Sequence, residues 1–388
     1  MKIISVVGAR PNFMKIAPFI RAIEKHNAGS GSGSGSGEQV EHRLVHTGQH
    51  YDHQMSQTFF DALNIPPADI HLGVGSGSHA EQVGNTMIAF EKVVMEEKPD
   101  WVVVVGDVNA TLACSVTAKK LHVKCCHIEA GLRSGDERMP EEINRLVTDR
   151  LSDLLLTPDT LSIENLKKEG VAESRIGFVG NIMIDTLEAQ RGKAASLTIA
   201  DVLKENLLLE DSLIPEVENE HYAVMTLHRP SNVDHKEIFT ALVDFLTDEV
   251  TSDMPLLWPI HPRARKQLEL FGLWDKVVST PNLVLMRPIG YHDMLRLNMT
   301  ARLIISDSGG IQGESIALGV KCLILRNNTE WVVTLKENGG SSVLVGNSPD
   351  NIRKEYRKAL NEEFSGEVPQ LWDGQTADRC LQQILEHR

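Results

Sequence analysis

The hydrophobic positions of this chain form short continuous runs that alternate with stretches of helical spacing. In the first half, apolar runs rich in β-branched residues occupy 2–7, 44–46, 101–105 and 123–128. Runs of this kind predict strands that are buried on both faces of a sheet. Between the first two runs, apolar residues recur every third or fourth position from Phe13 to Ile23, which predicts a covering helix. Strand, helix and strand in this order predict a parallel sheet.

The same alternation begins again after about residue 186. Five further strand-like runs occupy 222–227, 256–260, 283–286, 303–306 and 322–325. Two sheets of this kind predict an α/β protein with two doubly wound domains that face a central cleft, where ligands bind at the carboxyl ends of strands. We expect an N-terminal domain over 1–185, a C-terminal domain over 186–365, and a final helix within 366–388 that packs back toward the N-terminal domain.

One segment has the composition of a flexible linker. Residues 29–37 read GSGSGSGSG and fall between the first expected helix and the second expected strand. Gly and Ser repeats of this kind carry no chemistry of their own. We expect a surface loop here and give it no part in the function.

The charge balance narrows the class of partner. The 388 residues include 39 Lys and Arg and 53 Asp and Glu, which gives a formal net charge of −14. Nucleic acids and anionic membrane surfaces attract basic faces, so neither is expected as the main partner. A few local cations are still enough to bind a small anion such as a phosphate.

The hydropathy of the chain and its cysteines indicate the cellular compartment in which it works. No apolar run reaches the roughly 18–20 residues of a membrane span, and the N-terminus lacks a signal-peptide core. The five cysteines are an odd number and form no C-x-x-C pair, which argues against a disulfide framework or a structural zinc site. We expect a cytoplasmic protein.

Acidic side chains follow two expected strands of the first domain. Asp107 comes after the run 101–105, and Glu129 comes after the run 123–128. Carboxylates at one edge of a sheet are suited to general acid and base catalysis. The structural alternative is that Glu129 pairs with Arg133 and Asp107 caps the next helix. Glu141 and Glu142 open a further helix, where complementing the helix dipole explains one of them and leaves the other available.

A glycine-rich turn in the second domain has the features of a phosphate site. The segment SDSGGIQGES at 306–315 ends a strand and begins a helix. Glycines at 309 and 310 let backbone amides approach an anion, and the helix N-terminus favours negative charge. Glu314, one turn into the helix, is suited to ribose hydroxyls. The alternative is a simple helix cap by Asp307 or Ser308.

Basic residues follow several expected strands as well. Arg10 and Lys15 lie in GARPNFMK, near the start of the first helix, where cations are unfavourable unless an anion binds. His228 and Arg229 follow one strand of the second domain, and His261 follows another. Polar or phosphate contacts fit these residues better than a metal, because no carboxylate or Cys lies at ligand spacing.

Seven segments bring these residues together in a recognisable order. They read GARPNFMKIAP, HTGQHYDHQMSQTFF, VGDVNATLA, HIEAGLRSGDERMPEEINR, VGNIMIDT, TLHRPSNVD and SDSGGIQGES. Together they resemble the non-hydrolysing UDP-N-acetylglucosamine 2-epimerases, from residue 1 to about residue 346.

The resemblance implies a fold, an oligomeric state, a reaction, and whether a cofactor or a metal is required. It implies two Rossmann-like domains in the GT-B-like arrangement, a homodimer, no cofactor and no required metal. It implies that UDP is eliminated across C1–C2 of UDP-N-acetylglucosamine (UDP-GlcNAc), which leaves a 2-acetamidoglucal. UDP then adds back while a proton reaches the opposite face of C2, and the product is UDP-N-acetylmannosamine (UDP-ManNAc) for surface polysaccharide.

The resemblance also assigns residues. The catalytic set that it implies is Asp107, Glu129, Glu141 and His228. The substrate-binding set that it implies is Arg10, Lys15, Arg229, His261, Met294, Ser308, Gly309, Gly310 and Glu314. In that set, the serine and glycines bind phosphate, Glu314 binds ribose, and Met294 lines the uracil pocket together with backbone near Ile289.

The chain departs from the commoner family pattern at two positions. Trp331 stands where many members carry Arg after T-E, and Ser231 stands where Glu is commoner. The T-E-W sequence is similar to relatives that epimerise UDP-2,3-diacetamido-2,3-dideoxyglucuronic acid. Gln49, His50 and His261 resemble parts of a second, regulatory UDP-GlcNAc site.

Several functions therefore stay open beside UDP-GlcNAc 2-epimerisation. The nearest is the same reaction on the diacetamido-uronate, for which Arg133 and Arg138 are candidate ligands of the extra carboxylate. A hydrolysing epimerase would release UDP and free sugar. A glycosyltransferase would need an acceptor site, and a non-catalytic UDP-sugar sensor would bind without exchange at C2.

Overall fold

The computed structural model describes residues 1–30, 39–48, 65–209 and 214–387. The chain divides into two units, of which the first contains Met1–Ala189 together with Gln370–Arg388. The second unit is Gln190–Pro369. Each unit is built on one parallel sheet.

The first sheet has seven strands in the order β3-β2-β1-β4-β5-β6-β7, and all neighbouring strands are parallel. The strands are β1 (Lys2–Val7), β2 (Glu41–His46), β3 (Ile70–His71), β4 (Trp101–Val105), β5 (Lys124–Ile128), β6 (Leu154–Thr157) and β7 (Ile176–Phe178). The order reverses direction between β1 and β4, which creates the switch point where α/β sheets place their ligands.

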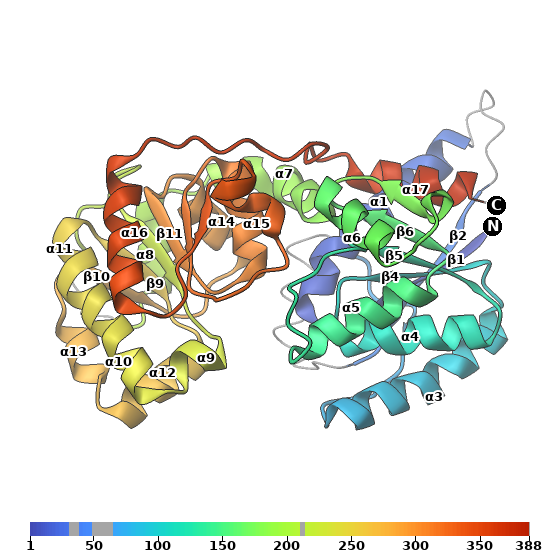
Figure 1. Ribbon diagram of the computed structural model, residues 1–388, viewed down its shortest axis with the longest axis horizontal. Helices are drawn as coiled ribbons and strands as arrows, with labels where there is room; N and C mark the ends of the chain where they lie inside the picture. Colours follow the sequence, from blue (N-terminus) through green and yellow to red (C-terminus); the bar gives the residue numbers. More distant parts are fainter. Residues whose placement is uncertain (31–38, 49–64, 210–213, 388) are drawn as a thin grey trace. The chain divides into compact units, whose positions relative to one another are not determined.

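Helices cover both faces of this sheet (Figure 1). They are α1 (Arg10–Ser30), α3 (His79–Glu97), α4 (Asn109–Lys120), α5 (Pro140–Leu151), α6 (Thr160–Lys168), α7 (Ile182–Ala195) and α17 (Thr376–Glu386). Buried side chains of α3 and α4 pack with Val102 and Val104 on one face, whereas α17 packs beside α1. The end of the chain thereby returns to the unit in which it began.

The second sheet has six parallel strands in the order β10-β9-β8-β11-β12-β13. They are β8 (Ala223–Thr226), β9 (Leu256–Pro259), β10 (Leu283–Met286), β11 (Leu303–Ser306), β12 (Cys322–Ile324) and β13 (Ser342–Leu344). Successive side chains point to opposite faces, so Ile304 belongs to one hydrophobic core and Ile305 to the other. Burial on both faces explains why these strands are continuously apolar.

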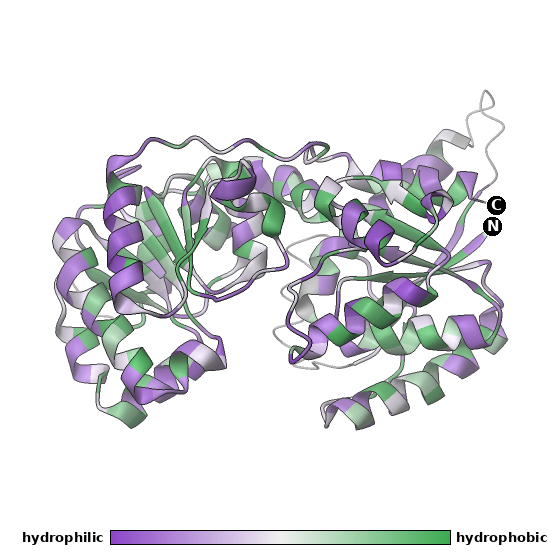
Figure 2. Ribbon diagram, viewed as in Figure 1, coloured by the Kyte–Doolittle hydropathy of each residue, from purple (hydrophilic) through white to green (hydrophobic). Residues whose placement is uncertain are grey.

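The helices of the second unit form the two outer layers. They are α8 (Ile199–Asn206), α9 (Pro230–Val233), α10 (Lys236–Phe245), α11 (Thr251–Asp253), α12 (Pro262–Phe271), α13 (Trp274–Ser279), α14 (Tyr291–Met299), α15 (Gly309–Leu318) and α16 (Pro349–Asn361). Side chains of α10, α12, α13 and α16 fill one core, and those of α8, α14 and α15 fill the other. In Figure 2 the strands are mostly hydrophobic and the helices carry the hydrophilic positions.

The predicted α/β class with two doubly wound parallel sheets is confirmed. All nine predicted strands exist, with shifts of a few residues at their ends. The strands β3, β6, β7 and β13 were not predicted; β3, β7 and β13 have only two or three residues, which carry little periodic signal. Of the Gly-Ser tract, Gly29 and Ser30 close α1, and 31–37 lie outside the described residues. No described helix is long and apolar enough to cross a membrane.

Candidate active site

The turn after β1 is tied to the end of β4 by one buried side chain. Asn12 Oδ1 accepts hydrogen bonds from the backbone N–H groups of Gly8 at 3.1 Å and Ala9 at 3.0 Å. Its Nδ2 donates to the Val105 carbonyl at 2.9 Å. Asn12 thus fixes the start of α1, and with it Lys15, against the carboxyl edge of the first sheet. The sequence interpretation missed Asn12, although a buried amide directly after a strand is a usable signal.

Lys15 and Glu129 form a buried ion pair at this edge. Lys15 Nζ binds Glu129 Oε2, and the two side chains are 13% and 4% exposed. Glu129 Oε1 is buried and has no hydrogen-bond partner among the described residues. Burial raises the pKa of the Glu129 carboxyl, and the charge of Asp107 adds to this effect while Lys15 opposes it. The structural alternative of a Glu129–Arg133 pair is therefore wrong: Glu129 pairs with Lys15, and Arg133 pairs with Asp149 and Glu169.

The backbone around Glu129 is adapted to this pair. Glu129 has φ +74°, a left-handed conformation that is uncommon for a residue with a side chain. Gly106, at the end of β4, has φ +69°, and a Cβ there would lie 3.1 Å from Lys15 Nζ. Gly106 thus leaves the space through which Lys15 reaches Glu129.

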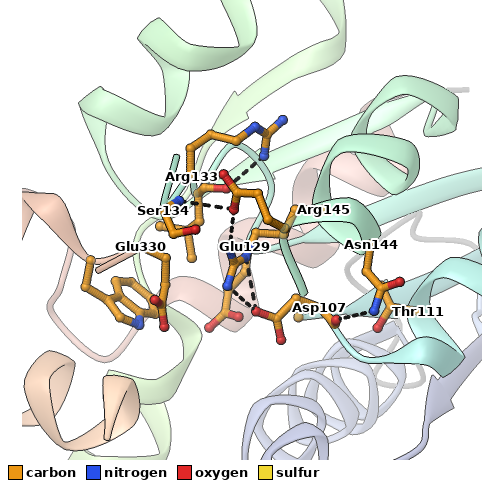
Figure 3. A network of polar contacts seen from close by, with 12 residues as sticks. Asp107, Thr111, Glu129, Arg133, Ser134, Asn144, Arg145 and Glu330 are labelled. Atoms are coloured by element: carbon orange, nitrogen blue, oxygen red, sulfur yellow. Dashed lines mark hydrogen bonds and ion pairs between the residues drawn. The ribbon is translucent and has the colours of Figure 1, made fainter. Parts of the chain in front are cut away.

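Asp107 is held by α5 rather than by the helix that follows it. Arg145 donates to Asp107 Oδ2 from Nη2 at 2.6 Å and from Nε at 3.1 Å. Asn144 Nδ2 donates to the Asp107 carbonyl at 2.8 Å (Figure 3). The cap residue of α4 is Val108, so the helix-cap alternative for Asp107 is wrong. The Asp107 side chain is 30% exposed.

The adjacent carboxylates Glu141 and Glu142 have different environments. Glu142 is 2% exposed, pairs with Arg145, and accepts from the backbone N–H groups of Ser134 at 3.1 Å and Gly135 at 2.9 Å. Glu141 is half-buried, and its side chain makes no hydrogen bond or ion pair within the described residues. Glu142 is thus committed to the fold, and Glu141 remains available to a ligand.

The start of α15 in the second unit presents backbone amides. Ser308 is the cap residue, makes no side-chain cap bond, and donates its backbone N–H to Ser306 Oγ at 3.0 Å. A Cβ on Gly309 would lie 2.5 Å from Glu330 Oε1, whereas one on Gly310 would have no neighbour nearer than 3.9 Å. Glu330 itself is held by Arg326 at 2.8 Å. The glycine at 309 is required by this close approach.

Asp307 organises the turn that carries His228 and Arg229. The Asp307 carboxylate is fully buried and accepts from the backbone N–H groups of His228 at 3.0 Å and Arg229 at 2.8 Å. It also lies 2.8 Å from His228 Nδ1. Burial alone would raise the pKa of Asp307, but His228 and these N–H groups lower it overall. From the sequence, Asp307 was considered only as one of two possible helix caps, and this role was missed.

His261 lies beside His228, with ring centroids 5.6 Å apart. Its Nδ1 accepts from the Arg263 N–H at 3.1 Å and so caps α12. Burial and the nearby His228 lower the pKa of His261. The His228 side chain is 40% exposed and His261 is exposed as well, so both rings are accessible to a ligand.

Glu314 lies one turn into α15 and is almost completely buried. It is 4% exposed, and the Tyr291 hydroxyl donates to Glu314 Oε1 at 2.9 Å. Burial raises the pKa of Glu314 to about 7. Met294, on the same helix as Tyr291, and Ile289 are partly buried against the core that includes Val284. A carboxylate, a hydroxyl and an apolar wall therefore occur on neighbouring elements of one unit.

Three of the residues singled out in the sequence have side chains outside the described part of the structure. Arg10 is the first residue of α1, but its side chain lies outside what the structure describes. Gln49 and His50 also lie outside the described residues. No group of three or more His, Cys, Asp or Glu that could hold a metal ion occurs in the described part of the chain.

Two Rossmann-like units, with a carboxylate cluster at one sheet edge and a glycine-rich helix start in the other unit, define an α/β protein of the GT-B-like class that includes nucleotide-sugar enzymes. Residues 35–385 match the family described as UDP-N-acetylglucosamine 2-epimerase. The chain belongs to that family.

Individual relatives agree with this membership. A "UDP-N-acetylglucosamine 2-epimerase homolog" of Methanococcus maripaludis is 40% identical over 358 residues, which is 92% of each chain. The UDP-2,3-diacetamido-2,3-dideoxy-D-glucuronate 2-epimerase of Pseudomonas aeruginosa is 34% identical over 390 residues, which is 100% of each chain. The crystal structure of Methanocaldococcus jannaschii UDP-GlcNAc 2-epimerase in complex with UDP-GlcNAc and UDP superposes with a TM-score of 0.84, at 35% identity and 99% coverage of each chain.

Proposed function

We propose that this chain is an isomerase that interconverts UDP-GlcNAc and UDP-ManNAc by elimination and re-addition of UDP. The observation that carries the proposal is the Glu129 carboxylate, buried beside Asp107 with one oxygen unpartnered among the described residues. A buried acceptor without a partner is costly to a fold, so its persistence indicates a ligand or a reacting group.

The second unit supplies the groups that a departing UDP needs. The amides of Ser308, Gly309 and Gly310 at the start of α15 suit the diphosphate, because a helix N-terminus stabilises negative charge. His228 and Arg229, fixed by Asp307, add hydrogen-bond donors, and His261 stands next to His228. Stabilising the charge that develops on the leaving group lowers the barrier to C1–O cleavage.

The nucleoside part of the substrate has matching partners in the same unit. A ribose hydroxyl can donate to the Glu314 carboxylate, which is held in place by Tyr291. Met294 offers an apolar contact to uracil, close to the backbone at Ile289. We propose these residues as the uridine site.

The first unit supplies the groups that move protons at C2. Burial raises the pKa of Glu129, and a raised pKa favours a carboxyl that takes up and returns a proton. Lys15 binds Oε2 of Glu129, the oxygen that is not the unpartnered one. We propose that Arg10 acts beside Lys15. Asp107 and Glu141 are the further carboxylates proposed to act on the sugar, one held by Arg145 and the other without a side-chain partner among the described residues.

Proton NMR of UDP-GlcNAc with the pure protein in deuterated water, with no added cofactor or metal, tests the function. Loss of the C2 proton together with growth of a UDP-ManNAc signal is the expected result. Accumulation of free UDP with free sugar would instead identify a hydrolysing enzyme. Binding of UDP-GlcNAc without any exchange over hours would identify a sensor.

The second candidate substrate is the diacetamido-uronate. The Pseudomonas aeruginosa relative aligns over the whole chain. Trp331 lies in the T-E-W sequence by which this chain resembles such enzymes.

Of the two arginines that could bind the extra carboxylate, Arg133 is 11% exposed and pairs with Asp149 and Glu169. Arg138 is 89% exposed and pairs only with its sequence neighbour Asp136 among the described residues. Measuring kcat/KM for both compounds decides which of them is the substrate. If it is the diacetamido-uronate, Arg138→Gln should lower kcat/KM for the uronate and leave that for UDP-GlcNAc unchanged.

We also propose that the chain works as a homodimer in the cytoplasm. The support is the family membership and the five cysteines, which are all buried and free of disulfides. Light scattering of the purified protein measures the mass of the assembly, and a mass of one chain would remove the dimer from the proposal.

A further inference from the structure

A buried histidine lies between the two turns that carry Asp107 and Glu129. His127 belongs to β5 and is 0% exposed. Its Nδ1 lies 2.6 Å from Asp149 Oδ1, and its Nε2 lies 2.9 Å from the carbonyl oxygen of Gly106, the residue before Asp107. The mechanism proposed above gives this histidine no task.

The hydrogen-bond partners of His127 show which of its ring nitrogens carry hydrogen. A backbone carbonyl can only accept, and an ionised carboxylate can only accept. Both ring nitrogens must therefore carry hydrogen if both contacts are hydrogen bonds. That condition makes the ring of His127 an imidazolium, for which Asp149 is the counterion.

Asp149 also controls the turn that follows β5. Its second oxygen accepts from the Gly131 N–H at 3.0 Å and lies 2.7 Å from Arg133 Nη1. Burial alone would raise the pKa of Asp149, but His127 and Arg133 lower it overall. Asp149 is thus an ionised, fully paired carboxylate inside the first unit.

The turn that Asp149 holds is conformationally demanding. Glu129 and Gly131 both have positive φ, of +74° and +83°. A Cβ on Gly131 would lie 2.4 Å from the Ser162 carbonyl oxygen, so the backbone passes very close to α6. A residue with a side chain keeps such a conformation only where its surroundings determine it.

One helix holds both turns. Asn144 and Arg145 of α5 bind Asp107, and Asp149 lies about one helical turn further along the same helix. From there Asp149 reaches His127 and Gly131, so α5 contacts the turn after β4 and the turn after β5.

We propose that His127 and Asp149 are positioning residues, and that their imidazolium–carboxylate pair sets the placement of Asp107 and Glu129 relative to each other. His127 supports the Gly106 carbonyl on one side, and Asp149 supports the Gly131 amide on the other. The assignment of a catalytic consequence rests on the proposed function, whereas the charge state of the pair does not.

Asp149→Asn is the test variant, and Asp153→Asn is its matched control. Asp153 is also a paired carboxylate: it pairs with Lys119 of α4 at 2.7 Å and accepts from the Cys125 N–H of β5 at 2.8 Å, at the amino end of the strand. Both variants should lower the melting temperature. Only Asp149→Asn should lower kcat for exchange at C2, by about 10²-fold or more, with little change in KM.

Two outcomes would overturn the proposal. One is an equal loss of kcat in both variants, which would reduce Asp149 to a structural role. The other is an unchanged kcat in folded Asp149→Asn protein. UDP affinity should stay the same in both variants, because the residues proposed to bind UDP belong to the other unit.

Nitrogen-15 NMR of the histidine side chains covers the case in which Asp149→Asn does not fold. The wild-type His127 ring, assigned with His127→Gln, should show hydrogen on both nitrogens under the conditions of the activity assay. A ring with a single hydrogen would contradict the pair as described. If the wild type exchanges neither candidate substrate, the proposed function fails, and this measurement still decides the charge state of the pair.

Discussion

Arg145 Nη2 lies 2.6 Å from Asp107 Oδ2, and the same guanidinium pairs through Nη1 with Glu142. One buried arginine therefore connects a carboxylate that is 30% exposed with one that is 2% exposed. The two carboxylates lie 35 residues apart in the sequence but share one cation. Asp107 is thus accessible to a ligand, whereas Glu142 stabilises the fold.

Asp107→Asn tests the exposed member of this set. The amide keeps the size of the side chain but removes its charge and its basicity. We expect exchange at C2 to fall by about 10²–10⁴-fold, the usual contribution of a general acid or base. Isothermal titration with UDP should show unchanged affinity. A collapse of UDP affinity would instead mean that Asp107 has a structural role.

Glu141→Gln and Glu142→Gln form a matched pair at adjacent positions. Breaking a buried ion pair by removing one charge costs about 3–5 kcal/mol, so Glu142→Gln should destabilise the protein clearly. Glu141 has no side-chain partner among the described residues, so Glu141→Gln should change stability by less than about 0.5 kcal/mol.

For activity we expect the opposite order: the variant that keeps its stability, Glu141→Gln, should be the one that loses turnover. Glu141→Gln is expected to lower turnover in protein that melts like the wild type. Thermal unfolding and NMR exchange assays on the two variants measure both properties. The assignment of Glu141 is wrong if its variant retains full turnover.

Glu314 makes stability depend on pH. Its pKa is raised from an ordinary value of 4.5 to about 7, so the folded state binds this proton more tightly than the unfolded state. The stability linked to it is therefore complete below about pH 4.5 and is lost as pH rises through about 7. The loss amounts to at most about 3.4 kcal/mol, from 1.36 kcal/mol per pKa unit.

Glu314→Gln removes this titration and keeps an acceptor for Tyr291. We expect the melting temperature of the wild type to fall relative to that of Glu314→Gln between pH 5 and 8. Parallel pH profiles for the two proteins would show that Glu314 is not protonated in the folded state at low pH within this range.

Gly309→Ala and Gly310→Ala distinguish close approach from open space at the start of α15. The methyl group at 309 would meet Glu330 Oε1 at 2.5 Å, and the one at 310 would meet nothing nearer than 3.9 Å. We therefore expect Gly309→Ala to displace Glu330 and to weaken UDP binding by about tenfold or more, which is 1.4 kcal/mol or more. Gly310→Ala should fold normally, and it serves as the control for helix propensity. Equal UDP affinity in both variants would argue against a phosphate site that depends on this approach.

Much of the fold was predictable because the buried strands of a parallel sheet are continuous apolar runs. The runs at 2–7, 101–105, 283–286 and 303–306 correspond residue for residue to β1, β4, β10 and β11. The strands that escaped prediction are β3, β6, β7 and β13, of which β3, β7 and β13 have only two or three residues and cannot establish a period. The covering helix from Phe13 to Ile23 likewise followed from its spacing, within α1.

The candidate site was predictable in its members but not in its pairings. Asp107, Glu129 and His228 each follow a strand, and the carboxyl ends of parallel strands meet at one edge of a sheet. For Asp307 the local sequence offered only the alternative of a helix cap, whereas its hydrogen-bond donors, the backbone N–H groups of Arg229 and His228, lie 78 and 79 residues away.

The sequence by itself thus determined the α/β class, the family and the residues that end the strands, because these depend on local composition and order. Only the tertiary structure decided that Lys15 pairs with Glu129 across 114 positions and that His127 lies between Asp149 and Gly106. It also decided which of Glu141 and Glu142 is buried. Such choices depend on contacts between distant segments, and no local period along the chain encodes them.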